Sequence, residues 1–203
     1  MKGLLLKDFY VLLKQLKLYL VIIVILSVIP SLNMTSFGII YAAMLPITVI
    51  AFDERSKWDQ LAVMMPYTRN ELVFSKFLIG YIGVAVTSVI SIGIQLVIAA
   101  VNGQAIAMEQ ILSVVLIAFA SVFLLAIYLP FLFWLGVERG RILFLVLMAI
   151  MFLGMMSIDS IKKLMELSTI TPAKLLLGGA VAAIAANAVS VTVSKHAYMR
   201  KFI

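Results

Sequence analysis

The sequence predicts an all-α integral membrane protein with six transmembrane helices, and its composition is the first reason. Of its 203 residues, 65% are hydrophobic and only 12% are charged, and the mean hydropathy is +1.19. An average soluble domain is about 45–50% apolar and about 25% charged, so this chain has too little polar surface for a water-soluble globule. These values exclude a water-soluble enzyme, a disordered chain and a fibrous protein.

Long runs without charge are the second reason, because a charged side chain at the centre of a bilayer costs about 2.5–3.5 kcal/mol. A helical span needs about 20 residues. The run over 18–52 is too long for one span, and its polar middle over 30–36 predicts a tight hairpin between two spans. We therefore expect one domain over residues 1–203, with spans at about 18–33, 36–52, 77–101, 111–135, 142–158 and 174–194.

The distribution of basic residues predicts the topology. With both termini in the cytoplasm, the cytoplasmic segments 1–17, 53–76, 136–141 and 195–203 hold thirteen of the sixteen Lys and Arg residues. The positive-inside rule predicts this asymmetry. A single span over 18–52 would turn segment 53–76 outward, which the same rule disfavours. Because the basic residues lie between apolar runs, we assign the net charge of +7 to anionic lipid headgroups and not to nucleic acid.

Residues 1–17 predict an amphipathic helix that lies in the membrane interface. Apolar side chains recur at helical spacing and lysines cluster on another face: Leu5, Phe9, Leu12, Leu13 and Leu16 against Lys7, Lys14 and Lys17. The apolar side would lie in the acyl region, with the lysines towards the lipid phosphates. The alternative is that this segment only lengthens the cytoplasmic end of the first span.

Segment 53–76 is the longest polar insertion, and it predicts a short amphipathic helix. Asp53 can cap the helix that follows it, and Pro66 ends that helix. One side of the helix carries apolar side chains, namely Trp58, Leu61, Ala62 and Met65. Thr68 and Glu71 then form a capping box for the helix that enters the third span. We interpret the short helix as a docking helix for a cytoplasmic protein; the alternative is a connector on the membrane surface without a partner.

The sequence contains no catalytic constellation and no metal-ligand set. It lacks the G-x-x-x-x-G-K-[ST] and H-E-x-x-H motifs, it has no cysteine, and its single histidine, His196, is typical of a solvated tail residue. No paired carboxylates lie on a span, and no base is placed to activate a serine or threonine. All nine acidic residues lie outside the spans or at their ends, unlike the midplane charges of ion-coupled transporters. Energy for uphill transport would therefore come from another protein.

Polar and small residues inside the spans predict helix packing. Gln95 and Asn187 are the most polar side chains well inside the spans, and we expect hydrogen bonds between helices rather than substrate contacts in a cavity. The last span carries a small residue at every fourth position, at Gly178, Ala182, Ala186, Ser190 and Ser194. Such a face lets helix backbones approach closely in lipid. It predicts packing within the chain or, less favoured, across a subunit boundary.

Two short blocks resemble the small six-span permeases of the ABC-2 family. The first is MKGLLLKD at residues 1–8, ahead of the first span. The second is FDERSKWD at 52–59, followed by Met65-Pro66 and by RNELVFSK at 69–76. This pattern is most similar to the permeases of phenol-soluble-modulin exporters and of bacteriocin-type peptide exporters in Gram-positive bacteria.

The resemblance implies a coupling helix over residues 53–65 that inserts into a groove of a separate ABC ATPase, with Asp53, Glu54, Arg55, Lys57 and Trp58 as docking side chains. It implies two ATPases on a pair of permeases, the second a copy or a paralogue. ATP and Mg²⁺ would bind to the ATPase, with no cofactor in this chain. Amphiphilic peptides, toxins or antibiotics would cross the bacterial cytoplasmic membrane by alternating access. The alternative is a non-transporting membrane scaffold or immunity protein that sequesters a toxin.

Overall fold

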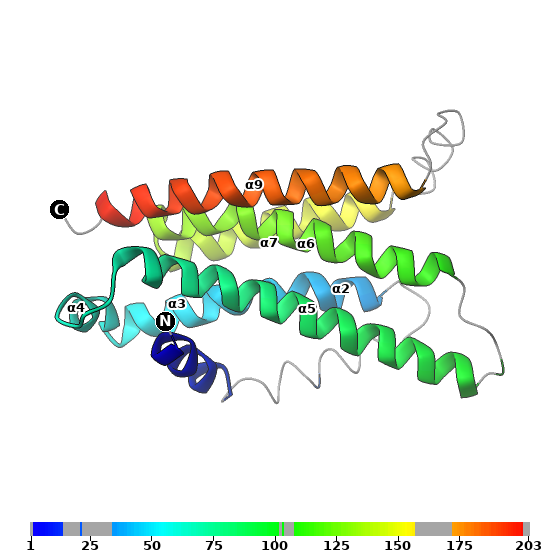
Figure 1. Cartoon of the computed structure of the whole chain (residues 1–203), viewed down its shortest axis with the longest axis horizontal. Helices are drawn as coiled ribbons and strands as arrows, with labels where there is room; N and C mark the ends of the chain where they lie inside the picture. Colours follow the sequence, from blue (N-terminus) through cyan, green and yellow to red (C-terminus); the bar gives the residue numbers. More distant parts are fainter. Residues whose placement is uncertain are drawn as a thin grey trace.

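The computed structural model describes residues 2–13, 21, 34–101, 103, 108–156 and 172–200, and this part of the chain is helical with short turns and contains no strand (Figure 1). A helix over residues 2–13 comes first. It is followed by α2 (Met34–Ala42), α3 (Leu45–Arg55), α4 (Trp58–Val63), α5 (Arg69–Val101), α6 (Met108–Leu135), α7 (Val137–Met156) and α9 (Pro172–Arg200). The predicted all-α class is thereby confirmed for the described residues.

Three of the described helices are long and apolar enough to cross a membrane, over Arg69–Val101, Gln110–Leu135 and Gly178–Tyr198. They contain the whole of the predicted spans over 77–101 and 111–135 and most of the span over 174–194. The span expected at 18–33 and the hairpin after it lie almost wholly outside the described residues. The count of six spans therefore stays a prediction.

The predicted span over 36–52 is divided into α2 and α3 by a turn at Ala43 and Met44. Pro46 has no N–H group to donate to the carbonyl of the preceding helical turn, so the ladder of helix hydrogen bonds is interrupted there. The N–H of Ile47 instead donates to the carbonyl of Met44 at 3.1 Å. The turn leaves the Ala43 carbonyl to accept a 2.5 Å hydrogen bond from the hydroxyl of Tyr128 on α6.

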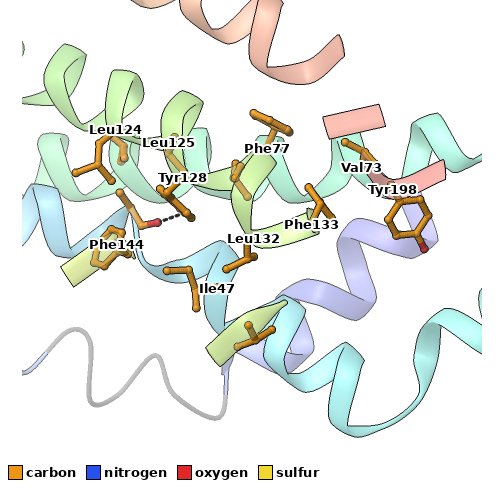
Figure 2. Close-up of a cluster of buried hydrophobic side chains, with 14 of the residues drawn as sticks. Ile47, Val73, Phe77, Leu124, Leu125, Tyr128, Leu132, Phe133, Phe144 and Tyr198 are labelled. Carbon is orange, nitrogen blue, oxygen red and sulfur yellow. Dashed lines mark hydrogen bonds between the residues drawn. The ribbon is translucent and has the colours of Figure 1, made fainter. Parts of the chain in front are cut away.

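The core of the bundle is formed where α2, α3, α5, α6, α7 and α9 face one another (Figures 1 and 2). Figure 2 shows its bulky side chains, which include Ile47, Phe77, Leu125, Tyr128, Leu132, Phe133, Phe144 and Tyr198. The rings of Tyr128 and Phe144 meet edge to face with centroids 5.3 Å apart. Those of Phe133 and Tyr198 do the same at 5.8 Å. These contacts join α6 to α7 and to the last turns of α9.

One end of the bundle collects the polar segments (Figure 1). The helix over 2–13, the end of α3, α4, the start of α5, the junction of α6 with α7 and the end of α9 all lie at this end. It therefore contains the described parts of all four segments predicted to be cytoplasmic. The end of α5 and the start of α6 lie at the opposite end.

Candidate functional site

Four charged side chains from three helices meet at the polar end of the bundle. Lys7 and Asp8 come from the helix over 2–13, Asp53 from the last turns of α3, and Lys76 from α5. The Lys76 ammonium donates to both oxygens of Asp8 at 2.8 and 2.9 Å and to Asp53 at 2.6 Å. The Lys7 ammonium donates to Asp53 at 2.5 Å and lies 3.0 Å from Asp8. We call Lys7, Asp8, Asp53 and Lys76 the four-charge cluster.

Three of the four charged side chains are almost fully removed from solvent, whereas the Lys7 side chain is 22% exposed. Asp8 is 0% exposed, Asp53 4% and Lys76 6%. Two ammonium groups and two carboxylates give no net charge, and each buried carboxylate is ion-paired with both lysines. This mutual pairing offsets the cost of burying charge, because an unpaired ion in the same place would be strongly unfavourable.

Asp53 does not cap a following helix, in contrast to the sequence prediction. Helix α3 continues through Asp53 to Arg55, because the Asp53 carboxylate binds the two lysines and is not directed at backbone N–H groups. The short helix begins only at Trp58, after a turn at Ser56 and Lys57 in which Lys57 has left-handed backbone angles (φ 52°, ψ 32°). Asp53 is thus a buried member of the four-charge cluster. Its carboxylate is not exposed, so it is not positioned for the predicted contact with a docking partner.

Helix α4 is attached to the cluster through its first residue. The Lys7 ammonium lies 4.4 Å from the centroid of the Trp58 ring, a cation–π contact. The indole Nε1 is buried and has no hydrogen-bond partner among the residues that the structure describes. Ala62, one turn further along α4, is also buried, at 1% exposure. One side of α4 therefore faces the bundle.

The other side of α4 and the turns before and after it are exposed. Leu61 is 50% exposed, Met64 85% and Met65 40%. Glu54, Arg55 and Lys57 are exposed as well, so three of the five predicted docking side chains lie on the surface. The predicted apolar stripe divides accordingly: Trp58 and Ala62 turn inward, whereas Leu61 and Met65 turn outward. Met64, the most exposed of these side chains, is the one that the sequence pattern missed.

The predicted capping box of the next helix is confirmed. The N–H of Thr68 donates to the Glu71 carboxylate at 2.9 Å, and the N–H of Glu71 donates to the Thr68 hydroxyl at 3.3 Å. These reciprocal bonds fix the start of α5 directly after the α4 segment. The position of Lys76, less than two turns further along α5, is thereby set relative to α4.

Comparison with known families identifies the family of the chain. Residues 3–199 match the model of the ABC-2 family transporter proteins, which is nearly the whole chain. The chain belongs to the ABC-2 family. Comparisons with curated proteins and with solved structures gave no match.

ABC-2 family membership makes the chain a membrane protein and a component of membrane transport. Among its described residues, no group of three or more His, Cys, Asp and Glu side chains is placed to hold a metal ion. The polar end of this ABC-2 protein contains the paired charges of the four-charge cluster and an exposed apolar surface.

The other predicted site residues of the ABC-2 chain lie away from the four-charge cluster. Asn187 joins three helices: its Oδ1 accepts from the Tyr81 hydroxyl at 2.8 Å, and its Nδ2 donates to the carbonyls of Val122 at 3.2 Å and Ala183 at 2.7 Å. This is the interhelical role expected for it. Gln95 is half-buried on α5, and its Oε1 has no hydrogen-bond partner among the described residues.

The predicted small-residue face on α9 is only partly covered. Gly178 and Ala182 are exposed, Ala186 is half-buried and Ser190 is 4% exposed. Ala186 and Ser190 line an apolar groove of about 810 Å³ between α6 and α9. The face is thus more buried towards the polar end of α9 and exposed towards its start.

Sequence reasoning missed Lys7, Asp8 and Lys76 as site residues. Their signal was nevertheless present, because opposite charges stand at the ends of apolar segments that were all predicted to lie on one side of the membrane. Pairing those charges would have pointed to the four-charge cluster.

Proposed function

We propose that this ABC-2 chain is the permease subunit of an ATP-driven exporter in the bacterial cytoplasmic membrane, with both termini in the cytoplasm. Two permeases would work with two ATPase subunits, which would bind ATP and Mg²⁺. The cargo would be amphiphilic peptides, toxins or antibiotics, moved by alternating access. The family match and the absence of a phosphate-binding loop in the sequence support a permease that depends on a separate ATPase subunit for ATP hydrolysis.

The single observation that carries the proposal is the exposed side of α4. Met64 and Leu61 are large apolar side chains that project from a polar segment outside the long apolar helices. Exposed apolar groups with charged neighbours are typical of protein-binding surfaces. Glu54, Arg55 and Lys57 supply those neighbours. We therefore assign the docking surface to the exposed charged and large apolar side chains of segment 54–65. The buried Asp53 and the half-buried Trp58 connect this segment to the bundle.

Movement would pass from the ATPase into the bundle through α4. Closure of the ATPase pair around ATP would displace α4, which is joined to α3 by a two-residue turn and to α5 by the capped segment at 64–68. Both neighbours belong to the packed core, so a rigid displacement of α4 would bias the packing of the bundle between two arrangements.

The proposal is tested by placing a charge on the docking surface. Met64→Glu should abolish co-purification with the partner ABC ATPase and remove cargo-stimulated ATP hydrolysis in proteoliposomes. Met108→Glu is the matched control, because Met108 is 80% exposed at the opposite end of the bundle. That variant should assemble normally.

Assembly and ATP hydrolysis that are unchanged by Met64→Glu would refute the docking surface. If the unmodified chain binds no ATPase, yet protects cells from a toxin, the scaffold or immunity function would replace the exporter.

A further inference from the structure

The four-charge cluster connects the helix over 2–13, α3 and α5 beside the start of α4. We propose that it is a positioning device that locks α4 to the helix over 2–13, so that the two elements move as one body. This rests on the proposed function, because the body would be moved by the ATPase. Lys7 is the central residue of the device, and Asp8, Asp53 and Lys76 hold it in place.

Lys7 is the point at which three elements meet. Its ammonium belongs to the helix over 2–13, donates to Asp53 at the end of α3 at 2.5 Å, and lies 4.4 Å from the ring of Trp58 at the start of α4. The turn between α3 and α4 is also fastened, since the Ser56 hydroxyl donates to the Asp53 carbonyl at 3.3 Å. A displacement of α4 relative to the helix over 2–13 must therefore break a charge-assisted hydrogen bond, a cation–π contact or both.

Lys76 prevents the cluster from rearranging. It donates to Asp8 and to Asp53 from α5 and so fixes both carboxylates that Lys7 needs. Each carboxylate thus binds both ammonium groups, and no carboxylate is free to follow Lys7 if it moves. A buried polar network with all its members paired is rigid, whereas its contribution to net stability is small. Such a network therefore fixes the relative positions of the helices that it joins more than it contributes to the free energy of folding.

The two elements that the cluster joins have different surroundings. The helix over 2–13 exposes large apolar side chains, with Leu6 55%, Phe9 51% and Tyr10 61% exposed. An apolar surface of this kind at the end of a membrane bundle suits contact with lipid at the interface. Helix α4 and the turn that follows it instead expose Leu61 and Met64 for the ATPase. The cluster would therefore couple a displacement of α4 to the helix over 2–13, which is held in the membrane interface by lipid. Because lipid would resist sideways movement of that helix, the displacement would be transmitted to α3 and α5.

Distances between spin labels test the proposal directly, because the sequence has no cysteine and each label can be placed on an introduced one. Labels at Tyr10→Cys and Gln60→Cys report on the helix over 2–13 against α4. Labels at Gln60→Cys and Met108→Cys report on α4 against the opposite end of the bundle. All three positions are exposed, and none of them is one of the charged or apolar docking side chains of segment 54–65. The measurements are made on the complex with its ATPase, with ADP and with a non-hydrolysable ATP analogue, and on the permease alone.

The expected result is a narrow Tyr10–Gln60 distance that stays the same in both nucleotide states, while the Gln60–Met108 distance shifts. Lys7→Met should broaden the first distance and make it change with nucleotide, and Lys7→Arg should restore the narrow distribution. Lys2→Met is the control, because Lys2 is an exposed lysine on the same helix. It should behave as the unmodified chain.

A Tyr10–Gln60 distance that changes with nucleotide in the unmodified chain would overturn the locked body. So would a Lys7→Met variant with a narrow, constant distance. A Gln60–Met108 distance that does not respond to nucleotide would instead count against the proposed function. If Lys7→Met does not fold, Trp58→Leu removes the ring and leaves the four charges paired, and the Tyr10–Gln60 distance in the permease alone should then broaden.

Discussion

The hydroxyl of Tyr128 stabilises the turn that divides α2 from α3. It donates to the Ala43 carbonyl at 2.5 Å, and both residues are fully buried. Tyr128→Phe removes this donor from a buried acceptor, which costs about 1–3 kcal/mol. We expect a lower midpoint of thermal unfolding in detergent, followed by circular dichroism.

Tyr10→Phe is the matched control for Tyr128→Phe. Tyr10 is 61% exposed, and substitutions at such positions change stability by about 0.5 kcal/mol or less. Equal shifts of the unfolding midpoint in the two variants would contradict the role given to the buried hydroxyl.

Residue roles were predictable from the sequence where the partners are close along the chain. The capping box depends on Thr68 and Glu71, three residues apart, and the sequence alone predicted it. The partners of Asp53 are 46 residues away at Lys7 and 23 away at Lys76. Local reasoning therefore assigned Asp53 to a cap, because nothing near it in the chain reveals the lysines that the fold brings to it.

At the scale of elements, the close packing of α5 depends on one of its glycines. A Cβ atom at Gly80 would lie 2.7 Å from Leu125 on α6 and 3.0 Å from Pro46 on α3. At Gly93, on the same helix, nothing lies within 4 Å of a Cβ. Gly80→Val should therefore lower stability by about 1–3 kcal/mol through overpacking. Gly93→Ala should raise it by about 0.5–1 kcal/mol through helix propensity.

The two glycine variants are compared by their unfolding midpoints in the same detergent. A Gly80→Val variant as stable as the unmodified chain would show that α5 does not approach α3 and α6 so closely.

The turn that separates α3 from α4 depends on the backbone of Lys57. A residue with a side chain in the left-handed region costs about 1–2 kcal/mol relative to glycine, and Lys57 has φ 52°. Lys57→Gly should keep or increase stability, whereas Lys57→Val should decrease it, because a branched side chain crowds this conformation most. Thermal unfolding of both variants gives the order, and a Lys57→Val variant more stable than Lys57→Gly would contradict it.

The positions of the long helices could be predicted from the charge-free runs, whereas the breaks between helices could be located only in the tertiary structure. The runs placed the apolar parts of α5, α6 and α9 correctly to within a few residues. Pro46 was visible inside the predicted span over 36–52, but the turn at Ala43 and Met44 is stabilised by Tyr128 from α6. The start of α4 also depends on the four-charge cluster. Because the Asp53 carboxylate binds Lys7 and Lys76, it does not cap a new helix, and α3 continues past Asp53.

At the scale of the whole molecule, the charged residues predicted which helix ends lie at the same end of the bundle, but not which helices pack against one another. The described parts of the four segments predicted to be cytoplasmic lie at one end of the bundle (Figure 1). The order in which helices pack could not be predicted, because most of their surface is apolar and shows no single face for the core. Asn187 indicates a contact in the sequence, but its partners on α5 and α6 appear only in the structure.

The orientation of the bundle in the membrane is the last prediction, and it decides which end can meet an ATPase. Thirteen of the sixteen basic residues lie in the four segments predicted to be cytoplasmic, so the positive-inside rule turns α4 and the α6–α7 junction inward. We introduce single cysteines at the exposed positions Gln60, Arg139 and Met108 and treat intact cells with a membrane-impermeant maleimide. Met108→Cys should react at once, and Gln60→Cys and Arg139→Cys only after the membrane is permeabilised.

The cysteine at Arg139 separates two ways in which this orientation could be wrong. Reaction of both Gln60→Cys and Arg139→Cys in intact cells, with Met108→Cys protected, would mean that the whole bundle is inverted, as a single span over 18–52 with a cytoplasmic N-terminus requires. Reaction of Gln60→Cys alone would mean that α4 and the α6–α7 junction lie on opposite sides, against their shared end in the structure. In either case α4 would face away from ATP, and an ATPase could not reach Met64.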